Sequence, residues 1–157
     1  MNTLSFGWSE CTRLADELVK PINKVFVGFE HPAWGPTSVT LWRLGGTGLR
    51  IDSRMYDIAA RLEVGVLQIT PVSTPPTDNL NAAVDAAFAK EILAFKLTIE
   101  ESGIRAESGI VLRADSHEII VVAGAFPFCL AVSGPFTEPN TFHPEYPIDR
   151  YTRTLFA

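Results

Sequence analysis

Apolar and polar residues alternate along most of this chain, and alternation is the period of a β-strand that buries one face. The pattern predicts strands over residues 24–30, 37–44, 49–56, 61–71 and 95–101. A glycine-rich run at residues 45–48 predicts a tight turn, because glycine adopts positive φ without steric cost. Hairpins are therefore expected to be the main unit of the fold.

The most apolar stretch lies at residues 109–135. Residues 110–112 run into a polar break at residues 115–118, and an uncharged apolar run continues to residue 132. This pattern predicts two strands joined by a tight turn, the second buried on both faces, and a further strand after Pro127. No nucleophile elbow, phosphate loop or metal-ligand cluster interrupts the stretch, so we interpret it as scaffold.

Two segments have the pattern of helices. Residues 10–20 carry one apolar stripe at helical spacing, with Ser9 as the expected cap and Pro21 as the stop. The alanine-rich residues 80–93 predict a second helix. Between them, Pro75 and Pro76 place residues 71–77 in a surface loop, because proline fits neither a ladder nor a helix interior.

These elements predict an α+β fold. We expect one mainly antiparallel sheet, with a mixed sheet left open, of about seven strands with two helices packed on it. A length of 157 residues suits one domain spanning residues 1–157. Residues 136–157 hold three prolines and five aromatic residues, which predicts an extended tail packed on that domain.

The net charge of the chain limits the kinds of partner that we expect. The formal net charge is -5, and no run of lysine or arginine overrides it, so we do not expect nucleic-acid binding. The N-terminal residues lack a signal-peptide pattern, and the apolar run at residues 119–132 is too short for a membrane helix. We expect no membrane contact and a cytoplasmic location. Cys11 and Cys129 are expected to be buried free thiols.

Few residues suggest covalent chemistry. His31, His117 and His143 lie far apart in the sequence, so no metal site is expected. No dinucleotide or phosphate-loop motif occurs, and we expect no cofactor and no catalytic residues. The sequence leaves open whether the chain is an enzyme, and the absence of a catalytic motif favours a protein without enzymatic activity.

Carboxylates and one tryptophan are the best candidates for a binding surface. Asp52, Asp57 and Glu63 flank the predicted strand pair around residue 55 and suggest an acidic patch that docks a cationic protein surface. A solvated acidic face without function is the simpler alternative. Trp34 lies in a loop rich in proline and glycine, where it is either a lid over the core or an interface anchor.

The segments at residues 53–55, 61–67 and 124–132, in a small acidic chain without a catalytic constellation, resemble the immunity proteins of bacterial polymorphic toxin systems. The resemblance implies a protein that occludes a cognate toxin, with an acidic surface that steers a basic enzyme into place. It assigns no binding residue, because the resemblance lies in general character and not in a motif.

Our leading hypothesis is a non-enzymatic module that binds a protein partner, such as a basic toxin domain, and a homodimer is left open. The expected partner-binding residues are Glu30, Trp34, Asp52, Asp57 and Glu63. One alternative is a small enzyme or ligand-binding domain with a pocket beside residues 71–77, in which Glu63 or Glu100 is the acid–base residue. Another is a structural subunit of a homo-oligomer, expected if an apolar strand or the tail stays exposed.

Overall fold

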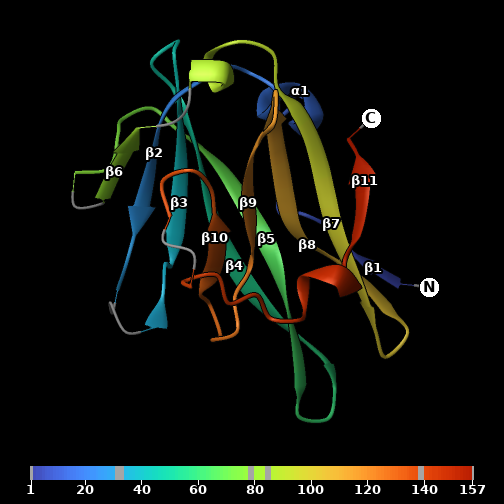
Figure 1. Cartoon of the computed structure of the whole chain (residues 1–157). Coiled ribbons are helices and arrows are strands. Elements are labelled where there is room, and N and C mark those ends of the chain that lie inside the picture. The colour runs from blue at the N-terminus through green and yellow to red at the C-terminus, as the bar shows by residue number, and fades with distance from the viewer. Residues whose placement is uncertain (1, 31–33, 78–79, 84–85, 138–139, 157) are drawn as a thin grey trace.

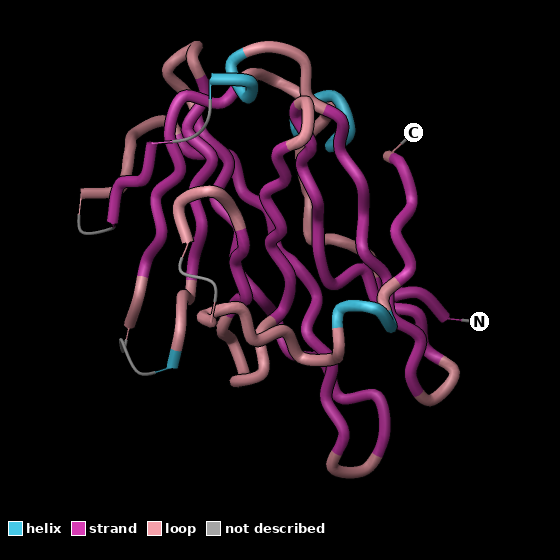
Figure 2. Tube along the Cα trace, viewed as in Figure 1, coloured by secondary structure: helices cyan, strands magenta, loops and turns pink. Residues whose placement is uncertain are grey.

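The chain folds into two β-sheets that pack face to face, as the computed structural model shows for residues 2–30, 34–77, 80–83, 86–137 and 140–156 (Figures 1 and 2). The five-stranded sheet has the order β5-β4-β3-β2-β6, and neighbouring strands are antiparallel. Its strands are β2 (Ile22–Gly28), β3 (Ser38–Arg43), β4 (Gly48–Ala59), β5 (Leu62–Val72) and β6 (Leu80–Ala83).

The six-stranded sheet has the order β10-β9-β8-β7-β11, and β1 pairs with β8 as its one parallel pair. Its strands are β1 (Asn2–Leu4), β7 (Leu93–Glu101), β8 (Ile104–Ala114), β9 (His117–Ala123), β10 (Leu130–Ser133) and β11 (Thr152–Leu155). From β7 to β10 the strands follow in chain order, which is the pairing that short connections favour.

The main core lies between the two sheets. Alternate residues of β2, β3 and β4 face alternate residues of β8, β9 and β10, and nearly all of them are fully buried. Representative members are Val25, Leu41, Ile51, Ile110 and Val121. Because each sheet covers the apolar face of the other, the sandwich needs no helical layer.

The other face of the six-stranded sheet is also apolar and forms a second core. Val111 and Val122 pack there with Val64 of β5 and with Tyr151 from the C-terminal segment. Residues 109–112 of β8 and 119–123 of β9 are therefore largely buried on both faces, which explains their continuous apolar sequence. Residues 143–145 run beside the end of β9, where Glu145 N–H donates to the Ala123 carbonyl and Ala125 N–H donates to the His143 carbonyl.

The N-terminal segment connects the two sheets. After β1 has paired with β8, Gly7 bridges to Gln68 of β5 and exchanges backbone hydrogen bonds with Leu67 and Ile69. A Cβ atom at position 7 would collide with the end of the Gln68 side chain, so a larger residue there requires that side chain to move.

The expected α+β fold class is wrong, because the fold is mostly β, with two sheets in place of one. The predicted strands lie close to the observed ones. They divide into two sheets, however, and the apolar face of one sheet packs against the apolar face of the other. Residues 104–108 of the expected polar connection also join β8, where Ser108 is the extra residue of a bulge opposite Leu97 and Thr98 of β7. Sequence alternation alone does not say which faces meet.

Both predicted helices need correction. The first is a short helix, α1 (Leu14–Leu18), whose N-cap is Arg13 in place of Ser9. Cys11 lies before it and is exposed, not buried, whereas Cys129 is buried as expected. In place of the second helix, β6 pairs with β2, and a 3-10 turn, η2 (Ala86–Ala89), follows. The free edge of β2 outweighs the helix propensity of the alanines.

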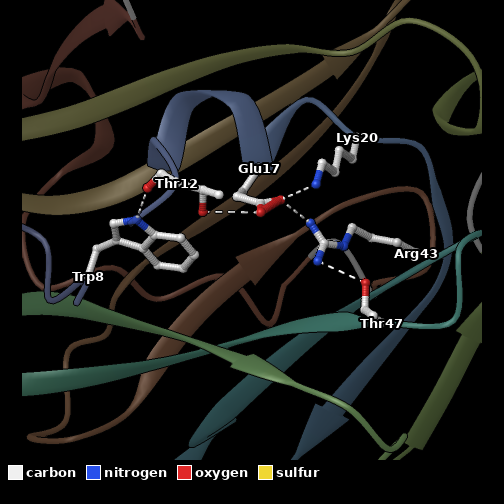
Figure 3. Close-up of polar contacts among 6 residues, drawn as sticks. All are labelled: Trp8, Thr12, Glu17, Lys20, Arg43 and Thr47. Atoms are coloured by element: carbon white, nitrogen blue, oxygen red, sulfur yellow. Dashed lines mark hydrogen bonds and ion pairs between the residues drawn. The ribbon is translucent and has the colours of Figure 1, made fainter. Parts of the chain in front are cut away.

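A buried ion pair holds α1 against the β3–β4 turn (Figure 3). The Arg43 guanidinium donates to Glu17 Oε2 at 2.6 Å and to Thr47 Oγ1 at 2.9 Å. Lys20 also contacts Glu17 Oε2 at 2.6 Å, and the Trp8 indole N–H donates to the Thr12 carbonyl at 2.7 Å. This network fixes the end of the sandwich opposite to the features described next.

Candidate functional site

An apolar, half-open pocket lies where the end of β2 meets the β9–β10 turn and the C-terminal segment. We call it the aromatic pocket, and its volume is about 460 Å³, within the range of ligand-binding cavities. β2 and the segment after it supply one wall, and the β9–β10 turn and the C-terminal segment supply the others. Its main lining side chains are Phe29, Trp34, Phe126, Cys129, Phe136 and His143.

The aromatic side chains at this end are unusually accessible. Phe29 is 42% exposed, Trp34 57%, Phe126 52% and the adjacent Phe128 62%. Large aromatic side chains grouped at the surface mark interaction sites, and tryptophan is the residue most enriched at binding hot spots. Trp34 is therefore a wall of an open pocket and not a lid over the core.

The β9–β10 turn presents its phenylalanines at a conformational cost. Phe128 has a positive φ of 64°, a left-handed conformation that costs a bulky residue about 1–2 kcal/mol. The Cys129 N–H donates to the Phe126 carbonyl across the turn at 3.1 Å. Strain of this kind collects at functional sites, and here it exposes an aromatic ring.

The thiol in the pocket is poorly suited to nucleophilic catalysis. Burial raises the pKa of Cys129, and the nearby Glu30 carboxylate raises it further. A raised thiol pKa lowers the fraction of thiolate, which is the reactive species. Cys129 therefore contributes apolar surface to the aromatic pocket, as a buried free thiol usually does.

A second feature, the acidic tip, lies at the same end of the sandwich (Figure 1). It consists of Asp57, Glu63 and Glu145. Asp57 and Glu63 are direct partners across the β4–β5 hairpin, and Glu145 Oε1 accepts a hydrogen bond from the Gly65 N–H at 3.1 Å. Arg61, in the turn itself, is the one cation of the hairpin end.

The carboxylates of the acidic tip affect one another. Burial raises the pKa of Glu145, the Gly65 N–H opposes that shift, and the negative charge of Glu63 adds to it. Two residues before Glu145, His143 lines the aromatic pocket. The C-terminal segment thus contributes His143 to the aromatic pocket and Glu145 to the acidic tip, with one residue between them.

The structure brings four of the five expected partner-binding residues to one end of the molecule. Trp34 lines the aromatic pocket, and the charge of Glu30 raises the pKa of Cys129 in that pocket. Asp57 and Glu63 form the acidic tip. Asp52 is not with them, because it lies an odd number of residues before Asp57 and points to the opposite face of β4.

The carboxylates expected in the alternative enzyme do not gather at a pocket. A cavity does lie beside residues 72–77, but neither Glu63 nor Glu100 lines it. Glu100 lies on β7 and pairs with Arg105 at 2.8 Å. Among the described residues, no group of histidine, cysteine and carboxylate side chains could hold a metal ion. His31 lies outside those residues.

Several residues of this end were missed in the sequence. Phe126 reads there as part of the apolar scaffold, and Glu145 as part of an aperiodic tail. The Glu145–Gly65 contact joins positions 80 residues apart, which no local pattern signals. A phenylalanine on each side of Pro127 is the one local hint that the turn is exposed.

Comparisons with family models, with curated proteins and with solved structures find no match to this chain. None of the helices in the described part of the chain has the length and apolar character that a membrane span requires. The aromatic pocket and the acidic tip are therefore the features from which a function can be inferred.

Proposed function

We propose that this protein is a binding module that acts by contact with a protein partner, through the aromatic pocket and the acidic tip. The observation that carries the proposal is that three exposed aromatic side chains, Phe29, Trp34 and Phe126, line one pocket. Phe128, also exposed, lies in the β9–β10 turn that forms one wall of that pocket. Burying these rings against a partner provides the apolar centre of an interface, and the polar groups around them provide its rim.

The charge distribution supports a cationic partner. Glu30 lies close to the aromatic pocket, and Asp57, Glu63 and Glu145 lie beyond its C-terminal wall. A complementary surface carries lysine or arginine around a large apolar side chain that enters the pocket. Such charge complementarity steers association and selects against acidic partners.

Neutralisation of a basic toxin domain by occlusion is the particular role that this surface would suit. An occluding protein needs no catalytic residues, only a surface that covers the active site of its target. The acidic net charge of -5 supports this role, as do the carboxylates at the binding end.

Selection of peptides from a displayed random library tests the proposal without a known partner. We expect the enriched peptides to combine lysine or arginine with a large apolar residue. Trp34→Ala should weaken their binding by about 30-fold or more, because truncation of a hot-spot aromatic costs about 2 kcal/mol or more. Leu44→Ala is the matched control, since Leu44 is 56% exposed beside the β3–β4 turn at the other end.

The charged part of the surface has its own comparison. The double variant Asp57→Asn, Glu63→Gln should slow association and reduce its salt dependence, whereas Asp115→Asn in the β8–β9 turn should change neither. Enrichment of acidic peptides would contradict the proposal, as would equal losses in Trp34→Ala and Leu44→Ala. Self-association lost in Trp34→Ala, measured by light scattering, would instead assign the surface to a homo-oligomer.

A further inference from the structure

A polar cavity lies on the outer face of the five-stranded sheet, remote from the acidic tip. Its volume is about 460 Å³, and residues 72–77 form one of its sides. Three side chains of β3 and β4 form its floor: Ser38, Thr40 and Arg50. The loop contributes the remaining lining residues, which are Val72, Thr74, Pro75, Pro76 and Thr77.

Strand register explains why the floor is polar. Thr40 and Arg50 are direct cross-strand partners, and Ser38 lies two residues before Thr40 on the same face. The residues between them, Val39 and Ile51, point into the main core. Thr40 is 1% exposed and Ser38 5%. Two hydroxyl-bearing residues are thus buried beside a guanidinium on a sheet face that could have been wholly apolar or wholly solvated.

Arg50 has hydrogen-bonding capacity to offer a ligand. Its ion pair with Asp52 is long, with 3.9 Å between Nε and Oδ2, and its side chain stays about half exposed. A guanidinium carries five N–H donors in a planar fork that fits the oxygens of phosphate or carboxylate groups. Hydroxyl groups of serine and threonine are the usual neutral donors to such oxygens.

We propose that this cavity binds a small phosphate monoester. Donors approach from the floor, at Ser38, Thr40 and Arg50, and from the loop, at Thr74 and Thr77. Donors on two sides suit a tetrahedral phosphoryl group better than a planar carboxylate. The cavity is larger than a phosphate ion, and Val72, Pro75 and Pro76 provide apolar surface for the organic part of the ligand.

Asp52 acts as the internal competitor for Arg50 in this site. Its carboxylate shares the outer face of β4 with Arg50 and Arg54. Burial raises the pKa of Asp52, while Arg50 and then Arg54 lower it, so the carboxylate is held near two cations in a partly desolvated position. A bound phosphoryl group replaces Asp52 as the partner of Arg50 and is repelled by it.

Calorimetric titration of the whole chain at about 0.15 M ionic strength, where charges beyond about 8 Å are largely screened, tests the assignment with phenyl phosphate, inorganic phosphate and benzoate as probes. We expect saturable binding in the order phenyl phosphate, phosphate, benzoate. Arg50→Gln should weaken phenyl phosphate binding by about tenfold or more, and Asp52→Asn should strengthen it by a few-fold. Arg54→Gln is the matched control, because it removes the same charge from the same face of β4 without lining the cavity, and it should change affinity by less than about twofold.

Three results would overturn the inference. The first is no saturable binding of phenyl phosphate to the unmodified chain. The second is equal affinity for phenyl phosphate and benzoate, and the third is an equal loss in Arg50→Gln and Arg54→Gln, which indicates general attraction of anions. Thermal unfolding of each variant, with and without phenyl phosphate, separates a lost site from a lost fold, since a ligand of the native state raises the midpoint.

Discussion

Asp57 and Glu63 face each other directly across the end of the β4–β5 hairpin. Both side chains are exposed and both are negative, and like charges at such positions destabilise a strand pair by about 0.2–1 kcal/mol. Glu145 brings a third carboxylate to the same place. Stability alone would not select this arrangement, so a role in binding accounts for it better.

Glu63→Lys should therefore stabilise the isolated protein while weakening its binding to cationic peptides. The new lysine pairs with Asp57 and removes the repulsion, a gain of about 0.5–1 kcal/mol in the free energy of unfolding, measured by urea titration. Glu100→Lys is the comparison, because it breaks the ion pair with Arg105 and should leave stability equal or lower. A stability loss in Glu63→Lys as large as that in Glu100→Lys would refute the electrostatic account of the acidic tip.

Removing one partner of the Glu17–Arg43 ion pair should destabilise the protein more than replacing both partners with apolar residues. Both side chains are nearly buried, at 11% and 10% exposed, and Arg43 Nε has no partner among the described residues. Glu17→Gln should lower the free energy of unfolding by about 2–3 kcal/mol, since it leaves the nearly buried Arg43 cation without its counter-charge. Glu17→Leu combined with Arg43→Met should recover most of that loss. Denaturant unfolding at neutral pH measures both, and a double variant less stable than Glu17→Gln would be evidence against this account.

The same pair should make stability depend on pH in the acid range. A hydrogen bond from Lys20, followed by one from Arg43, lowers the pKa of Glu17 below its ordinary value of 4.5, against the opposing effect of burial. A carboxylate with a lowered pKa in the folded state stabilises above its unfolded pKa and loses that contribution as the pH falls through the folded pKa. The stability difference between the native chain and Glu17→Gln should therefore shrink below pH 4.5. A difference that stays constant across the acid range would show that charge is not its cause.

The contribution of Glu145 to stability should depend on pH in the opposite direction to that of Glu17. Its pKa is raised by burial, so its contribution is fully present below the ordinary value of 4.5 and is lost as the pH rises through the folded pKa. Glu145→Gln keeps an oxygen for the Gly65 N–H and avoids the buried charge, so at pH 7 it should be at least as stable as the native chain. Glu145→Ala loses the hydrogen bond and should cost about 1 kcal/mol at pH 4, and less at pH 7, where the substitution also removes the buried charge. Unfolding curves at pH 4 and pH 7 distinguish the two variants, and a Gln variant as unstable as the Ala variant would contradict this prediction.

The two thiols should differ sharply in reactivity. Cys11 is exposed, whereas Cys129 is buried and has a raised pKa. We expect a thiol reagent such as iodoacetamide to label Cys11 in the folded protein and both cysteines in denaturant, as mass spectrometry can show. Rapid labelling of Cys129 in the folded state would indicate an activated thiol and would reopen a catalytic role for the aromatic pocket.

The strands were readable from the sequence because alternation reports local burial. The turn at residues 45–48 and the hairpin around residue 116 both lie where polar and glycine residues interrupt apolar runs. The prediction of a helix at residues 80–93 is wrong, because the pairing of β6 with β2 is a tertiary contact that alanine content does not reveal. The predicted α+β fold class is wrong for a related reason. Two sheets that pack on each other and one sheet covered by helices give the same alternating pattern in the sequence.

The candidate site was readable only in part. Trp34 stands out as a loop tryptophan, and the carboxylates stand out as a group. The sequence could not show that Asp52 points away from Asp57, because the continuous register of β4 decides it. Nor could it show that Glu145 completes the acidic tip, because a contact with Gly65 places that residue.

The most direct test of the central claim is to map where a cationic, apolar peptide from the selection binds, by backbone amide chemical-shift changes in the labelled protein. We predict that the largest changes fall on Phe29, Trp34, Phe126, His143 and Glu63, and that Trp34→Ala abolishes them at the same peptide concentration. Largest changes on the outer face of β3 and β4, around Thr40 and Arg50, would contradict the claim that the aromatic pocket and the acidic tip form the binding surface.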